Sequence, residues 1–238
     1  MRSLRILVGF ESSGVVRNAL RRLGHDAISC DFLPSDTPGP HIQDDVFNHV
    51  HGDWDMGIFF PTCTFMCNSS QKHLYIGMKK NEAGDNFCPD RWAKMEKSAR
   101  EFRYLDEELD YPRAIENPVM HGHAKSITGR AQDQVIHPYH FGHKQFKGTC
   151  LWLTDLEPLR PTTPWLKPPT DLEEKKKWEA NWRASQRADR WKDRSKTFDG
   201  VGDAMAAQWA GWATGVQAAM IRADQALLEV TSAYRMAA

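Results

Sequence analysis

The chain has 238 residues, of which 41% are apolar, and its 31 basic residues balance 31 acidic ones. This length allows one large domain or one domain with a small appendage. The apolar residues can form a core, but no run approaches the roughly 18 that a membrane span needs, so we expect no membrane partner. Because the net charge is zero, a nucleic-acid partner would be held locally, for example by residues 171–197, which carry nine Lys or Arg against six Asp or Glu.

The start of the chain and its cysteines indicate a cytoplasmic protein. The first apolar stretch reaches Glu11 too soon for a signal peptide and has no small-residue cleavage site. The five cysteines are scattered, and an odd number favours free thiols over a disulfide framework. Cys63, Cys67, His73 and Cys88 could in principle ligate zinc, but no Cys-x-x-Cys pair is present, and we predict no metal site.

Residues 5–31 predict a strand, a helix and a second strand. An apolar run over residues 5–10 precedes Ser12 and Ser13, which can cap a helix that Gly24 ends. The second strand, over residues 26–31, ends in an acid. Such a unit offers helix N–H groups to a polar ligand and a carboxylate to a ribose diol.

The first loop favours a cationic adenosyl ligand over a dinucleotide. It contains no complete G-x-G-x-x-G, and the charge of Glu11 would repel a pyrophosphate. S-adenosylmethionine therefore fits better than NAD. The alternative is a flavodoxin-like domain whose first loop binds nothing.

Further strands alternate with helical segments along the chain. Apolar runs predict strands over residues 54–60, 112–116, 134–139 and 149–153, and residues 91–109 predict a helix. This alternation indicates an α/β fold with a mostly parallel sheet covered by helices on both faces. The polar residues 68–90 predict a mobile loop over a site.

The C-terminal part, residues 171–238, is predicted to be a helical segment that packs back on the core of a single domain spanning residues 1–238. Residues 172–192 form a charged helix in which Trp178 and Trp182 share a face. We expect these tryptophans to dock the helix on the body, and an aromatic stripe facing nucleic acid is the alternative. Residues 201–221 predict an alanine-rich helix.

Two side chains at strand ends carry the predicted chemistry. Cys63 follows the strand over residues 54–60 in the sequence Pro61-Thr62-Cys63, where proline stiffens the turn. Glu116 ends the next predicted strand, in Glu116-Asn117-Pro118. A thiol and a carboxylate at such positions suit covalent attack by the thiol on a ring, with proton transfer by the carboxylate. The alternative is a buried structural thiol and a surface acid.

Together with these motifs, several others occur in the order found in DNA cytosine-5 methyltransferases, and the chain resembles the short, phage-type branch of that family. The matching elements are Phe10-Glu11-Ser12-Ser13-Gly14, Asp31, Asp45-Val46, Pro61-Thr62-Cys63, Glu116-Asn117-Pro118 and Gly202-Asp203-Ala204-Met205. The resemblance implies a Rossmann-like methyltransferase fold in the cytoplasm of a bacterium or a phage-infected host. It also implies methyl transfer from S-adenosyl-L-methionine to carbon 5 of cytosine in duplex or single-stranded DNA.

The resemblance assigns a role to each site residue. Cys63 would add covalently to carbon 6 of cytosine, Glu116 would hydrogen-bond the ring in its protonated form, and Asn117 would order the turn. Asp31 would hold the ribose of the cofactor and Asp45 its adenine amino group. The other implied cofactor contacts are Phe10, Ser12, Ser13, Gly14, Pro61, Gly202, Asp203 and Ala204, and the implied substrate contacts are Thr64, Lys144 and Lys147.

Departures from the family pattern leave the substrate open. Thr62 and Thr64 stand where the family has proline and glutamine, and Asp203 stands where it has asparagine. The chain is also too short for a full target-recognition domain. Two alternatives follow: the same chemistry on a free nucleotide or single strand, and a non-catalytic nucleic-acid-binding protein on the same fold. Oligomeric state is not predictable from these features.

Overall fold

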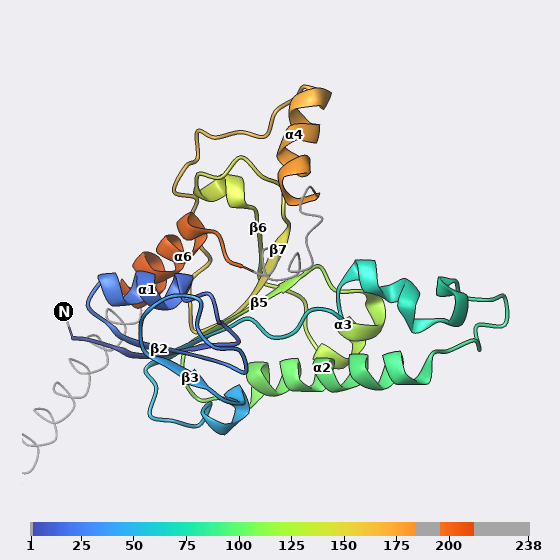
Figure 1. Ribbon diagram of the computed structural model, residues 1–238, viewed down its shortest axis with the longest axis horizontal. Helices are drawn as coiled ribbons and strands as arrows, with labels where there is room; N and C mark the ends of the chain where they lie inside the picture. The colour runs from blue at the N-terminus through green and yellow to red at the C-terminus, as the bar shows by residue number, and fades with distance from the viewer. Residues whose placement is uncertain (1, 184–195, 212–238) are drawn as a thin grey trace, which may run out of the picture.

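The computed structural model describes residues 2–183 and 196–211 and contains one seven-stranded sheet (Figure 1). The strand order is β3-β2-β1-β4-β5-β7-β6. Neighbours from β3 to β5 are parallel, whereas β7 runs antiparallel to both β5 and β6. The strands are β1 (Arg5–Gly9), β2 (Asp26–Asp31), β3 (His41–Gln43), β4 (Met56–Phe59), β5 (Arg113–Pro118), β6 (Gln134–Ile136) and β7 (Thr149–Thr154). This arrangement confirms the predicted α/β, Rossmann-like fold with a mostly parallel sheet.

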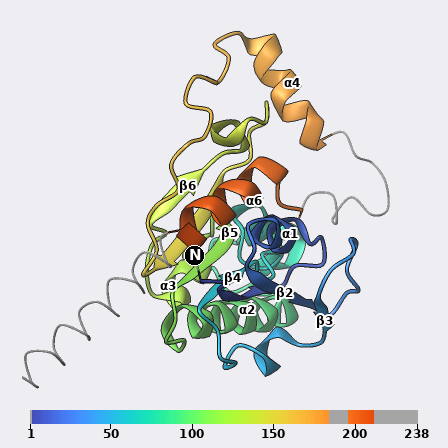
Figure 2. The ribbon, with the colours of Figure 1, turned by 90° about the vertical axis from the view of Figure 1, so that its left-hand side faces the viewer.

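Helices cover both faces of the sheet, as the two ribbon views show (Figures 1 and 2). One face packs on α1 (Val15–Arg22), α6 (Asp199–Met205) and the π turn that follows, Ala206–Ala210. The other face packs on α2 (Pro89–Glu107) and α3 (Gly122–Thr128). Because side chains alternate along a strand, Ile6 and Val8 enter the first core and Leu7 the second.

Several element boundaries differ from the predicted ones for local reasons. The strand predicted over residues 134–139 ends at Ile136, because Pro138 has no N–H for the ladder and begins the 3-10 helix η4 (Pro138–Phe141). The predicted loop over residues 68–90 contains two 3-10 helices, η2 (Asn68–Leu74) and η3 (Ile76–Met78). A further 3-10 turn, η1 (Val46–Asn48), follows β3.

The charged helix in the C-terminal part is α4 (Leu172–Arg183). Trp178 is buried against Tyr139 and Phe146, with ring centroids 6.1 and 5.4 Å away, so it docks the helix as expected. The side chain of Trp182, the whole of Trp191, and residues 212–221 of the helix predicted over residues 201–221 lie outside the described residues. Within the described ranges, no helix is long and apolar enough to cross a membrane, and no cluster of His, Cys, Asp or Glu could hold a metal ion.

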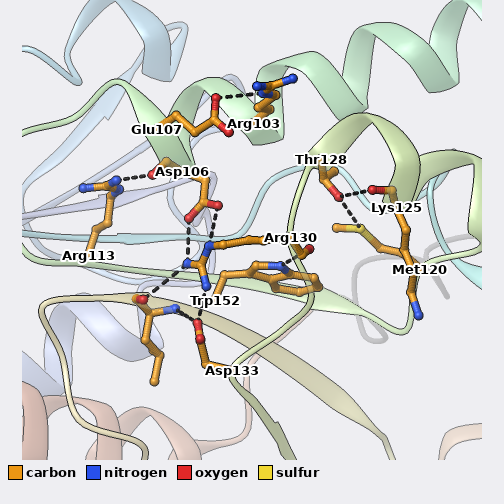
Figure 3. A network of polar contacts seen from close by, with 11 residues as sticks. Arg103, Asp106, Glu107, Arg113, Met120, Lys125, Thr128, Arg130, Asp133 and Trp152 are labelled. Atoms are coloured by element: carbon orange, nitrogen blue, oxygen red, sulfur yellow. Dashed lines mark hydrogen bonds and ion pairs between the residues drawn. The ribbon is translucent and has the colours of Figure 1, made fainter.

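An ionic network around the buried carboxylate of Asp106 braces the end of the sheet at which β5 begins (Figure 3). Arg130 forms a bidentate pair with the buried Asp106 of α2, with two contacts of 2.8 Å. Its guanidinium also reaches Asp133 at 2.6 Å, and Asp133 accepts from the Leu153 backbone N–H of β7 at 2.7 Å. Trp152 donates to the Arg130 carbonyl at 3.3 Å. The network therefore ties α2 to the segment before β6 and to β7.

Arg130→Met should destabilise the fold, because it leaves the carboxylate of Asp106 buried without its bidentate partner. We expect a loss of about 3 kcal/mol in the free energy of unfolding, measured by urea denaturation. The control is Arg103→Met, which removes an exposed pair with Glu107 and should cost less than about 0.5 kcal/mol. Equal effects of the two substitutions would contradict this role of the network.

Candidate functional site

The parallel register brings the predicted site residues to one edge of the sheet. Gly9 of β1 lies beside Cys30 of β2 and Phe59 of β4, and Phe59 lies beside Ile115 of β5. The next residue of each strand is Phe10, Asp31, Phe60 or Glu116. These four residues therefore lie at one level, at the carboxyl ends of adjacent parallel strands, where open α/β sheets bind ligands.

Cys63 lies in a tight turn just beyond β4. The backbone N–H of Phe60 donates to the Gly9 carbonyl at 3.0 Å, which extends the ladder by one residue. The Cys63 carbonyl then accepts from the N–H groups of Met66 at 3.0 Å and Cys67 at 3.1 Å. These bonds hold the nucleophile candidate on a closed turn, half-buried, rather than on a free loop.

Asn117 joins this turn to β5. Its buried side chain donates from Nδ2 to the Pro61 carbonyl at 3.3 Å, in agreement with the expectation that Asn117 orders the turn. Its Oδ1 is buried and accepts no hydrogen bond from the part of the chain that the structure describes. Pro61 is itself buried, so its contact with the site runs through its backbone.

A pocket lies beside Glu116, with about 340 Å³ of space that is partly open to solvent. Its polar side chains are Glu116, Lys147, Thr149 and Thr197. Its apolar wall is formed by Phe60, Ile136, Pro138, Phe198, Val201 and Met205. The segment before and within α6 thus supplies Thr197, Phe198, Val201 and Met205, which sequence reasoning had not assigned.

Burial favours the uncharged forms of both reactive groups. It raises the pKa of Cys63 to about 11, with the Glu116 carboxylate and Cys67 acting in the same direction and Lys147 against them. Burial also raises the pKa of Glu116, opposed by the charge of Lys147 and a hydrogen bond from Thr149. The raised pKa of Glu116 agrees in direction with the expectation of a protonated acid. The thiol form of Cys63 is therefore favoured at neutral pH, because desolvation outweighs the charge of Lys147.

Glu11 has a different position from the predicted one. Its carboxylate is buried and caps α1, accepting from the N–H groups of Val16 at 2.7 Å and Arg17 at 3.3 Å. These helix N–H groups are therefore not offered to a ligand, which corrects the sequence prediction. Burial raises the pKa of Glu11 despite these bonds, and its charge is withdrawn from the loop.

Arg17 organises the cofactor-side loop and was not identified from the sequence. The buried guanidinium donates to Ser29 and Ser35 and to the carbonyls of Thr37 and Pro38, at 2.9–3.1 Å. Gly14 has φ +70°, and a Cβ there would lie 2.3 Å from both Arg17 Nη2 and Thr37 Oγ1. Glycine is therefore required for this packing. The sequence signal for this role was a positively charged residue among the apolar positions of α1.

The two loop serines differ in orientation. Ser13 is buried, and its hydroxyl donates to Glu11 Oε1 at 3.3 Å. Ser12 accepts at its carbonyl from the Asp36 N–H at 2.8 Å. Phe10 has the left-handed φ of 59° and packs edge-on to Phe47, with centroids 5.8 Å apart.

The two predicted cofactor acids lie on neighbouring loops. Asp31 ends β2, and its Oδ1 accepts from the Leu33 N–H at 2.8 Å. Burial raises the pKa of Asp31. Asp45 caps η1 by accepting from the Phe47 N–H at 3.0 Å. Beside Asp31, Phe32 is 65% exposed, and sequence reasoning had not selected it.

The motif around Gly202 packs α6 on α1, and its last residue, Met205, lines the pocket beside Glu116. A Cβ on Gly202 would lie 2.9 Å from Val15 Cγ1, so glycine permits close approach of the helices. Ala204 is buried in the core. Asp203 is exposed and pairs with Arg22 of α1 at 2.5 Å. Its charge therefore lies on the surface.

The three residues predicted to contact the substrate do not all line the pocket. Lys147 lines the pocket, and its ammonium lies 6.0 Å from the centre of the Phe198 ring. Thr64 and Lys144 are exposed and contribute nothing to that pocket. His143 accepts from the Gly200 N–H at 3.1 Å and so anchors the first turn of α6.

No protein-family model matches the chain, and no curated protein matches it. The methyltransferase EhMeth of Entamoeba histolytica is similar over 67% of this chain and 55% of its own, with 14% identity and a TM-score of 0.42. Dnmt2 of S. pombe is similar over 79% and 57%, with 11% identity and a TM-score of 0.38. A DNMT2 variant of Spodoptera frugiperda is similar over 71% and 54%, with 12% identity and a TM-score of 0.31. The chain thus spans little more than half the length of these proteins, and its fold assignment rests on its own sheet.

The pKa of Cys63 makes a testable prediction about its reactivity. Alkylation by iodoacetamide, followed residue by residue with peptide mass spectrometry, should accelerate about tenfold per pH unit from pH 8 towards pH 11, because only the thiolate reacts. Glu116→Gln should accelerate alkylation at pH 9 several-fold by removing a negative neighbour, and Lys147→Met should slow it. A plateau of the Cys63 rate below pH 9, or the opposite signs in the variants, would refute this electrostatic description.

Proposed function

We propose that this chain transfers a methyl group from S-adenosylmethionine to carbon 5 of cytosine in a nucleic acid, with Cys63 as the covalent nucleophile. The observation that carries the proposal is that Cys63 and Glu116, near the carboxyl ends of β4 and β5, both interact with the charge of Lys147, beside Phe10 and Asp31 at the ends of β1 and β2. Such a set suits addition to a pyrimidine ring, since it provides a nucleophile, an acid and a cation.

The hydrogen-bond donors and acceptors that follow β1 and end β2 fit an adenosyl sulfonium ligand. Asp31 uses one carboxylate oxygen for Leu33, and its other oxygen accepts from no described residue, so it can accept from a ribose diol. Among the described residues, the backbone N–H groups of Ser12, Ser13 and Gly14 have no acceptor, and they can donate to a carboxylate. Because Glu11 is turned inward, its charge does not discriminate against a pyrophosphate, and the preference for S-adenosylmethionine rests on the chemistry of Cys63 and Glu116. S-adenosylmethionine would supply an electrophilic methyl group there.

The residues of this chain then account for each bond change. Cys63 loses its proton to solvent and its Sγ forms a bond to carbon 6, while Glu116 gives its proton to the ring nitrogen, which takes the electron pair displaced by the addition. Carbon 5 becomes nucleophilic and takes the methyl group, and the sulfonium would leave as a neutral thioether. Water takes the proton from carbon 5, Cys63 leaves as the thiolate, and the ring nitrogen returns its proton to Glu116, which restores the aromatic ring. The target base in a duplex would first be flipped out, at a cost of a few kcal/mol.

The segment of residues 68–88 supports a nucleic-acid substrate. It begins directly after Cys67 and projects from the body (Figure 1). Ile76 is 65% exposed and Met78 57% exposed, and Met78 has the left-handed φ of 58°. Lys72 and Lys80 line an open hollow together with Asn68, Ser69, Gln71, Tyr75 and Met78, without an acidic residue. An exposed apolar tip with a basic hollow suits stacked bases and phosphates, and we propose that this segment closes over the target.

A second candidate is a non-catalytic nucleic-acid-binding protein on the same fold. The pKa of Cys63 near 11 favours it, because little thiolate is present at neutral pH. Both candidates predict nucleic-acid binding, and they differ in cofactor binding and turnover.

The experiment combines a calorimetric titration with S-adenosylmethionine and a transfer assay with the labelled cofactor. The substrates are cytosine-containing duplex DNA, a single strand of the same sequence and a free cytosine nucleotide. We expect micromolar cofactor binding and label on carbon 5 of cytosine, with the loss of at least about 10³-fold in Cys63→Ala. Transfer that survives in Cys63→Ala would refute the mechanism. Nucleic-acid binding without cofactor binding would favour the second candidate.

A further inference from the structure

The turn that carries Cys63 is fastened along its length to the connection between β5 and α3. The Asn68 N–H donates to the Val119 carbonyl at 2.9 Å, and the His121 N–H donates to the Met66 carbonyl at 3.0 Å. An antiparallel bridge joins Cys67 to Met120. The turn of the nucleophile and the strand of Glu116 are therefore parts of one hydrogen-bonded unit.

His121 is the side chain that closes this unit. It is 1% exposed, and both of its ring nitrogens are engaged. Nε2 lies 3.0 Å from the Phe65 carbonyl, and Nδ1 lies 3.2 Å from the Ala124 N–H at the start of α3. Because a backbone N–H can only donate, Nδ1 must accept, and the proton of the neutral ring is on Nε2 and donates to Phe65.

This tautomer makes the imidazole a rigid link between two elements. On one side it caps α3, which packs against α2 and the second core. On the other side it holds the middle of the turn whose first carbonyl belongs to Cys63. Burial lowers the pKa of His121, and the neighbouring His123 lowers it further, so the neutral ring that this linkage requires is the favoured form.

We infer that His121 is a positioning residue, whose imidazole fixes the turn of Cys63 relative to Glu116 by donating to the Phe65 carbonyl while capping α3. The inference rests on the proposed function, since positioning matters for the reaction of these two groups. A shift of about 1 Å at a reacting group can cost about 100-fold in rate. His121 touches neither reacting group itself, and it acts through the backbone of the turn.

Two substitutions separate the link to the turn from the helix cap. In His121→Asn, Oδ1 can still accept from Ala124, but the side chain is too short to reach Phe65. In His121→Gln, the longer amide can place its NH₂ near the position of Nε2 and donate to Phe65. We expect His121→Asn to lower kcat at least about tenfold, with the KM for S-adenosylmethionine and the melting temperature near the wild-type values. His121→Gln should recover most of kcat.

A second measurement does not depend on methyl transfer. Iodoacetamide alkylation of Cys63 at fixed pH should be several-fold faster in His121→Asn than in the wild type, because the freed turn exposes the thiol, and close to wild type in His121→Gln. Cys88, at the start of α2, is the internal reference. If His121→Asn has the same Cys63 alkylation rate and the same kcat as the wild type, the inference is overturned. Equal losses in both variants with a lowered melting temperature would also overturn it, since they indicate a role in folding alone.

The proposed function and the positioning role of His121 can be refuted independently of each other. If the wild type transfers no methyl group, the proposed function is refuted, and the alkylation comparison still decides whether His121 fixes the turn. If transfer occurs and both His121 variants react like the wild type, only the positioning role is lost.

Discussion

The site depends on the hydrogen-bond register of β1, β2, β4 and β5. Since side chains alternate along a strand, Ala114 and Glu116 face α6, whereas Ile115 and Asn117 face α2 and α3. A slip of one residue between β4 and β5 would exchange Glu116 and Asn117. The acid would then leave the pocket, and the amide would leave the turn of Cys63. The antiparallel ladder of β7, which pairs Glu116 with Leu151 and Asn117 with Cys150, holds this register from the other side.

The surroundings of Cys63 favour its unreactive thiol form in the absence of ligands. With a pKa near 11, ionising Cys63 at pH 7 costs on the order of 5 kcal/mol. Burial, which raises this cost, also raises the pKa of Glu116 and so favours the protonated acid, which can hydrogen-bond to a ring. In the proposed reaction, the positive charge of a sulfonium ligand would act in the same direction as Lys147 and favour the thiolate. Premature reaction of the thiol is thereby limited until both ligands are bound.

Much of the fold could be predicted from the sequence, because strand and helix periods and the residues that end elements are local signals. The strand before Cys63, predicted over residues 54–60 and observed at Met56–Phe59, and the acid that ends β2 were found in this way. The partners of buried charges could not be found, because they depend on tertiary contacts. Glu11 was expected to face the ligand and instead caps α1, and Arg17 was not selected although it holds the loop over residues 34–40. Asp203 and Gly202 were assigned to the cofactor by resemblance, and their surroundings are those of a helix–helix contact.

The central claim is that Cys63 forms a bond to carbon 6 of cytosine during transfer. The most direct measurement is the intact mass of the protein after incubation with S-adenosylmethionine and an oligonucleotide that contains 5-fluorocytosine, where fluorine cannot leave as a proton does. The account predicts a stable protein–oligonucleotide adduct that maps to Cys63 and is absent in Cys63→Ala. Methyl transfer to ordinary cytosine without such an adduct, or an adduct on another residue, would contradict it.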